Sequence, residues 1–335
     1  MALVGQTYLN LKDKLAQTEN GKVTATIIDL YAQSNVLLED AITLECNDGS
    51  SHKTTVRNGL PEIEFRKFYQ GVKNTKGEYT QVTDTTSMLS AYSEIDKALA
   101  DMNNDANQLR LNEADSHIQS MNNKVQTAFF YGNKKANDAA FDGMATRYNK
   151  ISTKKDTIGA QVIDAGGVGT TNTSIWFVTW GDRHTHMLYP KGSQAGFKHA
   201  DKGVVTAKDN AGGQFEAYRD YFEWNTGLSV RNYKSTCRIA NIDVKKLGTE
   251  EAANLIELMI KGYYKVNKNA AGGKTVIYCN STIGSALHIQ AQNKANVNLS
   301  IDEVAGKPIV NFLGIPVKTC DQILDTESAV KVAND

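Results

Sequence analysis

Residues 47–90 read NDGSSHKTTVRNGLPEIEFRKFYQGVKNTKGEYTQVTDTTSMLS, and they decide how the rest of the chain is interpreted. They predict two long strand-like segments, 54–70 and 79–89, on either side of a polar turn at 71–77. The second segment is dominated by Thr, Gln, Asp and Ser, which suits a solvated ribbon. An isolated two-stranded hairpin is at best marginally stable in water, and this one has little apolar surface to bury. We therefore expect it to lie on another surface, first of all on a neighbouring copy of the chain.

The composition is that of a globular protein with a balanced charge. The chain has 335 residues, of which 41% are hydrophobic, so it is long enough for two or three units with their own cores. Lys plus Arg and Asp plus Glu number 37 each, so no overall field attracts nucleic acid or an anionic membrane. No uninterrupted apolar run is long enough to span a membrane, and the N-terminus lacks the order of a secretory signal. We expect no membrane association and a chain that stays in the cytoplasm where it is made.

The four cysteines, Cys46, Cys237, Cys279 and Cys320, are far apart in the sequence and form no Cys-x-x-Cys pair. A reducing compartment keeps such residues as thiols. We expect four packed, unpaired cysteines.

A single long helix is predicted over 107–131. Its apolar residues recur at alternating intervals of three and four, which is the period of one buried helical face; they are Leu111, Ala114, Ile118, Met121, Val125 and Ala128. Gly132 is a plausible stop. Lys and Glu are sparse along it, which disfavours a coiled coil. We expect the helix to lie across a sheet. Two further helices are predicted near the N-terminus, at 8–15 and 23–38.

The remainder of the chain is predicted to be rich in strands and then to alternate helix and strand. Strands are expected at 174–180, 187–189, 214–224, 228–235 and 237–242, with a turn at 225–227 and a Gly-bearing loop at 207–213. A helix begins with Thr249 as its cap, and a second helix, capped by Ser281, reaches about Gln292. Strands are also expected at 275–279, 309–313 and 316–319.

His184 and His186 lie two residues apart, which on a strand would place both imidazoles on one face, as a metal site requires. Catalytic zinc needs three protein ligands, and the sequence shows no third ligand at a spacing typical of a zinc site. We therefore favour a surface strand or loop with two histidines over a metal-dependent enzyme that uses them.

Two other patterns resemble ligand sites but lack residues that such sites require. Asp101, Asn103, Asp105 and Asn107 occupy the first positions of a calcium loop, but Ala106 stands where Gly is required and Asn112 where Glu is required. We expect this cluster to cap the long helix. The glycines at 166, 167 and 169 are not followed by Gly-Lys-Ser or Gly-Lys-Thr, so a flexible connection is favoured over nucleotide binding. No catalytic, cofactor-binding or metal-ligating residue is predicted, and we expect no enzyme activity.

The order of the parts resembles the major capsid proteins of tailed double-stranded DNA bacteriophages, which have the Hong Kong 97 type fold. The residues closest to that family are Asn47-Asp48-Gly49-Ser50, Arg57-Asn58-Gly59-Leu60-Pro61, Ala91-Tyr92-Ser93-Glu94, Asn172-Thr173-Ser174-Ile175-Trp176, Tyr189-Pro190-Lys191-Gly192-Ser193 and Arg238-Ile239-Ala240-Asn241. None is a catalytic motif, so the resemblance depends on their joint occurrence and order.

The resemblance implies an α+β fold with four parts. These are an N-terminal arm (1–46), an extended hairpin loop (47–90), a peripheral domain with the spine helix 107–131 and a β-sheet (91–244), and an axial domain with a C-terminal tail (245–335). In the commonest version of the fold the axial domain follows the spine helix closely. Here residues 132–244 intervene, which leaves the connection order open.

The resemblance also implies a structural function: hexamers and pentamers of an icosahedral shell that encloses packaged double-stranded DNA. The hairpin of one subunit would lie over the next, and its contact candidates are Arg57, Glu62, Glu64, Phe65, Arg66, Lys67, Phe68, Tyr69, Lys73 and Lys76. The expected partners are other copies of the chain, a separate scaffolding protein, a portal, a decoration protein and non-specifically contacted DNA. The expected locations are the virion capsid and, during assembly, the host cytoplasm. The alternative within the same fold is an encapsulin-like compartment around a cargo enzyme.

Overall fold

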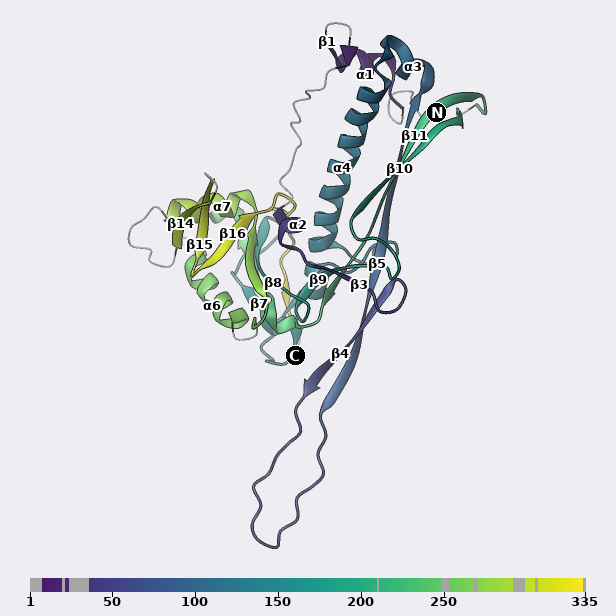
Figure 1. Ribbon diagram of the computed structural model, residues 1–335. Helices are drawn as coiled ribbons and strands as arrows, with labels where there is room; N and C mark the ends of the chain where they lie inside the picture. The colour runs from purple at the N-terminus through teal and green to yellow at the C-terminus, as the bar shows by residue number, and fades with distance from the viewer. Residues whose placement is uncertain are drawn as a thin grey trace. The chain divides into compact units, whose positions relative to one another are not determined.

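The computed structural model describes residues 8–19, 22–23, 36–209, 211–248, 253–267, 270–291, 299–304 and 307–333 (Figure 1). The chain divides into two compact units. Unit 1 comprises residues 1–33, 88–125 and 195–226, and unit 2 comprises 34–87, 126–194 and 227–335. The long helix α4 and the long strands β5 and β11 contribute residues to both. The four-part division predicted from the sequence groups the residues differently and stays a prediction.

Unit 1 packs short helices and a long hairpin against the first part of the long helix. Its elements are α1 (Leu11–Ala16), β1 (Thr18–Glu19), β2 (Lys22–Val23), the end of β5 (Glu78–Asp96), α3 (Lys97–Asp101), the start of α4 (Ala106–Tyr131), β10 (Phe197–Lys208) and β11 (Gln214–Val230). Ile95, Ala100 and Leu109 form a small core. Buried Lys14 forms an ion pair with Asp105, 3.0 Å away, and so ties α1 to the start of α4.

Unit 2 is built on a mixed sheet with neighbour order β14-β15-β16-β13-β8-β9-β11. The strands of the unit are β3 (Thr43–Glu45), β4 (Ser51–Gly59), β6 (Lys150–Ile151), β7 (Val162–Asp164), β8 (Asn172–Trp180), β9 (Thr185–Tyr189), β12 (Cys237–Asp243), β13 (Lys274–Cys279), β14 (Leu299–Val304), β15 (Lys307–Phe312), β16 (Ile315–Thr319) and β17 (Lys331–Val332). Of these, β6 and β17 pair with each other in a separate two-stranded sheet. Its helices are α2 (Val36–Asp40), α5 (Met144–Arg147), α6 (Leu255–Asn267), α7 (Ser281–Ala291) and the end of α4.

Strand β8 is the centre of this unit, and every one of its residues is buried. Because side chains alternate along a strand, its two faces contact different helices. Ile175 and Phe177 belong to the core that α6 and α7 complete. On the other face, Trp180 lies 5.5 Å from Phe129 of α4, between ring centroids. β8 pairs antiparallel with both β12 and β13, so the β-region between α4 and α6 shares its sheet and core with the last third of the chain.

The predicted spine helix is confirmed as α4, and Gly132 follows its last residue. Its predicted buried face is wrong at the start, because Leu111 is exposed and Leu109 is buried instead. The glycine is required for a reason other than a left-handed turn. A Cβ on Gly132 would lie 2.4 Å from the Phe141 carbonyl oxygen and 2.5 Å from that of Ala128. The segment after α4 therefore packs directly on the helix end.

We expect Gly132→Ala to lower the free energy of unfolding by about 1–3 kcal/mol, because both obstructing atoms are backbone atoms that cannot rotate away. Urea unfolding of the subunit measures the loss. Gly71→Ala is the matched control, because a Cβ there meets nothing within 4 Å. Equal urea midpoints for Gly132→Ala and Gly71→Ala would show that the backbone at the end of α4 shifts to accept the methyl group without loss of stability.

Several sequence predictions are confirmed, and others are wrong. The 8–15 helix is observed as α1, and the strands of the last third appear as β13, β15 and β16. The predicted turn at 225–227 is wrong, because β11 runs unbroken through it and ends at Val230. Strands β10 and β14 were not predicted; in β10, a register shift between Asp201 and Val204 disturbs the alternation.

The cap of α7 is also corrected. The side-chain oxygen of Asn280 accepts a hydrogen bond from the Ile283 amide (2.9 Å), so Asn280, not Ser281, caps the helix. The loop at 166–169 is more than a flexible connection, since the Gly167 amide donates to the Asn241 carbonyl oxygen (2.8 Å). The predicted cap at Thr249 and most of the 23–38 helix lie outside the described residues.

Candidate assembly surface

The predicted hairpin exists, with a different distribution of strand and loop. β4 pairs antiparallel with β5 from Ser51 opposite Thr85 to Gly59 opposite Glu78, with a register shift after Arg57. Residues 60–77 belong to no strand, so the predicted first strand is too long. The predicted turn at 71–77 is also misplaced. The chain reverses where the Gln70 amide donates to the Lys67 carbonyl oxygen (3.2 Å), and Tyr69 has a left-handed φ of 64°.

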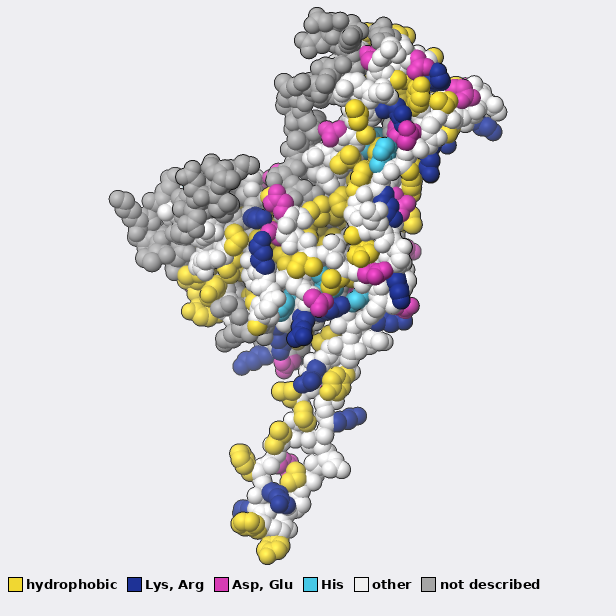
Figure 2. Space-filling view, viewed as in Figure 1, with side chains coloured by type: hydrophobic (Ala, Val, Ile, Leu, Met, Phe, Trp, Pro, Cys, Tyr) yellow, Lys and Arg dark blue, Asp and Glu magenta, His cyan; other side chains and the backbone are white. Residues whose placement is uncertain are grey.

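The tip of this hairpin, residues 60–77, exposes large apolar side chains. The exposed fractions are 107% for Phe65, 95% for Phe68, 108% for Tyr69 and 90% for Ile63. Figure 2 shows hydrophobic side chains beside Lys and Arg side chains along the loop. Scattered surface apolar residues are normal, whereas a contiguous exposed group of this kind marks an interaction site.

The charged contact candidates are equally accessible. All six in the tip are exposed, and within the described part of the chain none of them forms an ion pair; they are Glu62, Glu64, Arg66, Lys67, Lys73 and Lys76. Arg57 lies apart from them in β4, where its guanidinium stands over the Tyr79 ring, 5.7 Å from the centroid. The structure therefore brings nine of the ten candidates together in one loop. Among the described residues the charged side chains of that loop have no ion-pair partner, and its aromatic rings are almost fully exposed.

The base of the hairpin, in contrast, is anchored within unit 2 by polar contacts, most of them partly buried. Arg147 of α5 bonds the carboxylate of Asp84 in β5 (2.7 Å) and the Leu228 carbonyl oxygen (3.0 Å). On β4, His52 accepts a hydrogen bond from the Arg231 guanidinium, which also pairs with Asp182 (2.8 Å). These residues were missed in the sequence because each partner lies far away along the chain. The anchored base fixes the direction in which the exposed tip leaves the unit.

The expected surface position of His184 and His186 is wrong, because both are buried. His184 contacts the Ala271 carbonyl oxygen through Nε2 (2.9 Å). The His186 ring lies edge-on to that of His52, 5.9 Å between centroids, and neither of its nitrogens has a well-formed hydrogen bond to a described residue. Burial, with a smaller contribution from the positive charge of Arg231, lowers the pKa of His186 to about 4. The imidazole is therefore neutral at neutral pH.

The described part of the chain lacks a metal site of the kind considered in the sequence. It holds no group of three His, Cys, Asp or Glu side chains arranged for a metal ion. The carboxylate of Asp105, from the calcium-like cluster, binds Lys14 instead, and the backbone carbonyl oxygen of Asp105 accepts from the Leu109 amide (3.1 Å) at the start of α4. Among the described residues no helix is long and apolar enough to cross a membrane.

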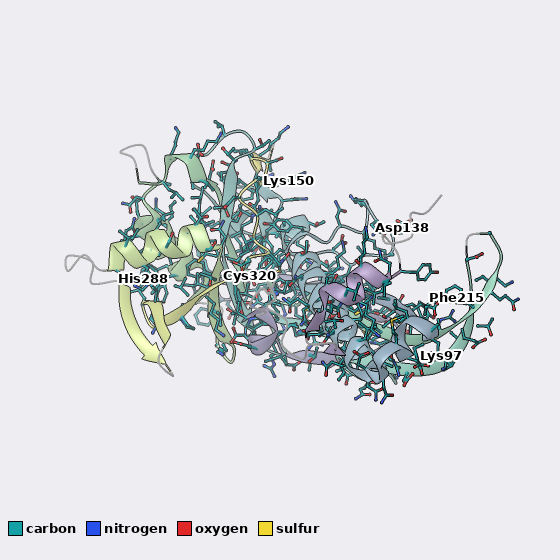
Figure 3. The ribbon with its side chains drawn as sticks, turned by 90° about the horizontal axis from the view of Figure 1, so that it is seen from above. Lys97, Asp138, Lys150, Phe215, His288 and Cys320 are labelled. Atoms are coloured by element: carbon teal, nitrogen blue, oxygen red, sulfur yellow. The ribbon has the colours of Figure 1, made fainter. Side chains whose placement is uncertain are left out.

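The four cysteines are buried and unpaired, as predicted. Burial raises the pKa of Cys237 and of Cys279 to about 12, so both are held as thiols. Cys320, labelled in Figure 3, contacts the Gln126 side-chain oxygen through its sulfur atom (3.0 Å). They serve as packing residues of unit 2.

A long helix packed across a sheet, together with an anchored hairpin whose exposed tip forms no ion pair with any described residue, defines a shell-forming capsid protein of the Hong Kong 97 type. The chain belongs to the family of major capsid protein GP7, whose pattern it matches over residues 18–331. It is a structural subunit of a bacteriophage capsid and assembles with copies of itself.

One solved structure supports this assignment strongly, and two others are far less similar to the chain. A chain in the near-atomic structure of bacteriophage Epsilon15 is 42% identical, with a TM-score of 0.79 over 98% of this chain and 99% of that one. The capsid of bacteriophage JBD30 is 11% identical, with a TM-score of 0.49 over 88% of this chain and 92% of that one. The SrpI encapsulin of Synechococcus elongatus is 12% identical, with a TM-score of 0.40 over 70% and 97%, and is only a distant relative. No curated protein matches the sequence.

Proposed function

We propose that this chain forms hexamers and pentamers of an icosahedral shell around double-stranded DNA, and that the hairpin tip of each subunit lies over its neighbour. The observation that supports the overlap is the near-complete exposure of Phe65, Phe68 and Tyr69 on a loop outside any core. Burying a Phe side chain contributes about 1.5–3 kcal/mol relative to leaving it exposed. Each contact is modest, but a closed shell repeats it many times.

The ten hairpin residues named above are the proposed contact residues. Phe65, Phe68 and Tyr69 supply apolar area, and the charged residues set the register with the neighbouring subunit. The arm (1–46), the hairpin (47–90), the peripheral region (91–244) and the axial region (245–335) are the proposed functional divisions. The role is structural, without catalysis.

The remaining partners follow from the same role. The equal numbers of basic and acidic residues suit an inner wall that encloses DNA without gripping it. A separate scaffolding protein, a portal and a decoration protein are the proposed protein partners, and assembly takes place in the host cytoplasm.

We expect the double variant Phe65→Ser/Phe68→Ser to fold and to fail to close shells, because it removes apolar contact area without touching the core. Particle yield by sedimentation and negative-stain microscopy measures assembly, and circular dichroism checks the fold. The matched control is Tyr264→Ser on α6, which removes another exposed ring (61% exposed) away from the hairpin. Normal particles from the double variant would show that the tip is dispensable.

A further inference from the structure

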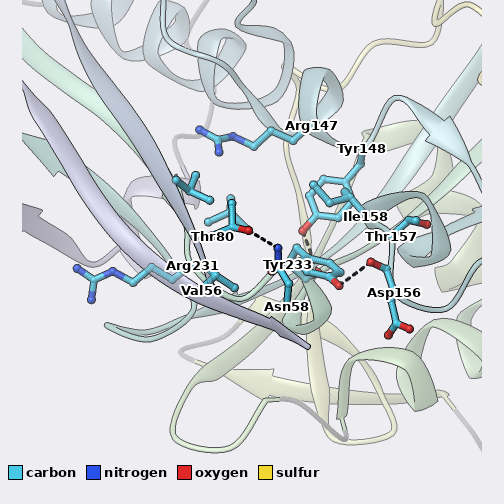
Figure 4. Close-up of a pocket in the computed structure, with 12 residues that line it drawn as sticks. Val56, Asn58, Thr80, Arg147, Tyr148, Asp156, Thr157, Ile158, Arg231 and Tyr233 are labelled. Atoms are coloured by element: carbon cyan, nitrogen blue, oxygen red, sulfur yellow. Dashed lines mark hydrogen bonds between the residues drawn. The ribbon is translucent and has the colours of Figure 1, made fainter. Parts of the chain in front are cut away.

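Two adjoining hollows lie at the base of the hairpin in unit 2. The first has a volume of about 400 Å³ and is shown in Figure 4. Its walls are largely apolar and come from three places: the hairpin strands (Val56, Val82), the segment after α4 (Tyr148, Ile158) and the end of β11 with the turn after it (Val230, Tyr233). Hydrogen bonds from Asn58 to Thr80 (2.7 Å) and from Tyr148 to the Tyr233 carbonyl oxygen (3.0 Å) hold this frame together.

The second hollow, of about 410 Å³, extends along β4, because five consecutive residues of that strand, 54–58, line it. Four cationic side chains surround it: Arg57, Arg183, Arg231 and Lys234. Two of them are neutralised within the subunit, since Arg231 pairs with Asp182 and Lys234 with Asp156 (3.3 Å). Within the described ranges Arg57 and Arg183 form no ion pair, so the hollow has a net positive charge.

The strand beside these hollows has an open edge. β4 pairs with β5, and no other described strand pairs with it. A strand edge presents unpaired amide and carbonyl groups to which an extended segment can add. A suitable occupant has three properties. Its extended backbone would bond to the edge of β4, its alternating apolar side chains would fill the first hollow, and its negative charges would pair with the cations of the second.

One exposed segment of the chain has this chemistry. Residues 60–65, Leu-Pro-Glu-Ile-Glu-Phe, contain two acidic side chains alternating with Ile63 and Phe65, and all are exposed. In an extended backbone, alternate side chains point to opposite sides, so the acids and the apolar residues separate. The rest of the tip, residues 66–77, contains four basic residues and no acidic one, so the cationic hollow would repel it.

We infer that residues 60–65 of a second copy of this chain dock along the free edge of β4, with Glu62 and Glu64 facing Arg57 and Arg183 and the apolar side chains in the adjoining hollow. The inference rests on the proposed function, because it names the surface on which the hairpin tip lies. The contact joins two different surfaces of identical subunits, so it can propagate around a ring.

Reciprocal charge reversal tests the pairing. Arg57→Glu/Arg183→Glu alone and Glu62→Lys/Glu64→Lys alone should each lower particle yield at least about tenfold, because like charges then face each other. The chain with all four substitutions should recover to within about twofold of wild type, because the pairs are restored with opposite sign. Lys134→Glu/Lys135→Glu, two exposed lysines elsewhere in unit 2, is the matched control and should assemble normally. A fourfold variant no better than either double variant overturns the inference.

Zero-length cross-linking identifies the occupant directly. A carbodiimide applied to assembled particles should join Lys234 to Glu62 or Glu64, with loss of water. Particles made from mixed ¹⁵N-labelled and unlabelled subunits show by mass spectrometry whether the two peptides come from different copies. The link from Lys234 to Asp156 within one subunit is the internal control. Intersubunit links from Lys234 only to other segments overturn the inference. If that happens while Phe65→Ser/Phe68→Ser still blocks assembly, the proposed function stands and only the docking surface is wrong.

Discussion

Replacing Glu327 by Gln should lower the free energy of unfolding of the subunit by about 3–5 kcal/mol, because it leaves a buried guanidinium without its counter-charge. Arg238 in β12 and Glu327 near the C-terminus are both nearly inaccessible, and their side chains lie 2.9 Å apart. A buried ion pair contributes little net stability compared with apolar residues of the same size. Removal of one partner is costly, since the remaining charge cannot reach water.

The contacts around this pair make the remaining charge difficult to accommodate. The Arg238 guanidinium also donates to the Ser174 hydroxyl (3.0 Å) and to the Tyr148 carbonyl oxygen (2.9 Å), so the side chain cannot swing outward without breaking both bonds. The Tyr131 hydroxyl at the end of α4 donates to Glu327 (2.5 Å). The carboxylate therefore joins the C-terminal segment, β12 and the spine helix.

Urea unfolding followed by tryptophan fluorescence measures this loss, and Trp176 is a local reporter because Arg238 stands over its ring, 4.9 Å from the centroid. The matched control is Glu257→Gln, which breaks an exposed ion pair with Lys261 on α6. Exposed pairs contribute about 0–1 kcal/mol, so this variant should unfold close to wild type. Similar midpoints for Glu327→Gln and Glu257→Gln would mean that water reaches the Arg238 site.

The sequence predicts best those features that depend on local periodicity. The spacing of apolar residues from Leu111 to Ala128 is sufficient to place α4, because a helix needs only its own residues to satisfy its backbone. It does not identify the buried face fully, since Leu111 is exposed. The exposed hairpin tip was predicted for a similar reason, since too few apolar residues lie nearby to bury Phe65 and Phe68. The turn was misplaced because the glycines at 71 and 77 are typical turn residues, whereas the reversal occurs at Tyr69.

Features made by residues far apart in the sequence were not predictable. His52 and His186 meet only because β4, β9 and the end of β11 come together, and neither histidine has a local pattern that indicates burial. The docking surface proposed for the hairpin tip has the same origin, since Arg57, Arg183 and Lys234 become neighbours only in the folded chain. Scattered basic residues in the sequence therefore concealed a local positive site in a chain of zero net charge.

The histidine pair makes the stability of unit 2 depend on pH. Burial lowers the pKa of His52, and it lowers the pKa of His186 to about 4. Arg231 opposes protonation of both rings, whereas Asp182 favours it for both and Asp84 for His52. The pKa of each histidine is lower in the folded chain than the unfolded value of about 6.5. As the pH falls, these histidines therefore take up protons in the unfolded chain before they do so in the folded chain. The stability that the folded chain gains from keeping these histidines neutral is complete above about pH 6.5 and is lost as the pH falls towards 4.

We expect the wild-type subunit to lose about 3 kcal/mol of unfolding free energy through His186 between about pH 8 and pH 4, since one pKa unit corresponds to about 1.4 kcal/mol. His186→Phe keeps an aromatic ring in the same core position and removes the titrating group. Urea unfolding of both chains at each pH separates this effect from the titration of carboxylates, which the two chains share. Between pH 8 and pH 4, the unfolding free energy of His186→Phe should fall by about 3 kcal/mol less than that of wild type, whatever its stability at pH 8. Parallel curves for the two chains would show that His186 takes up its proton in the folded state without penalty, and hence that water enters the base of the hairpin.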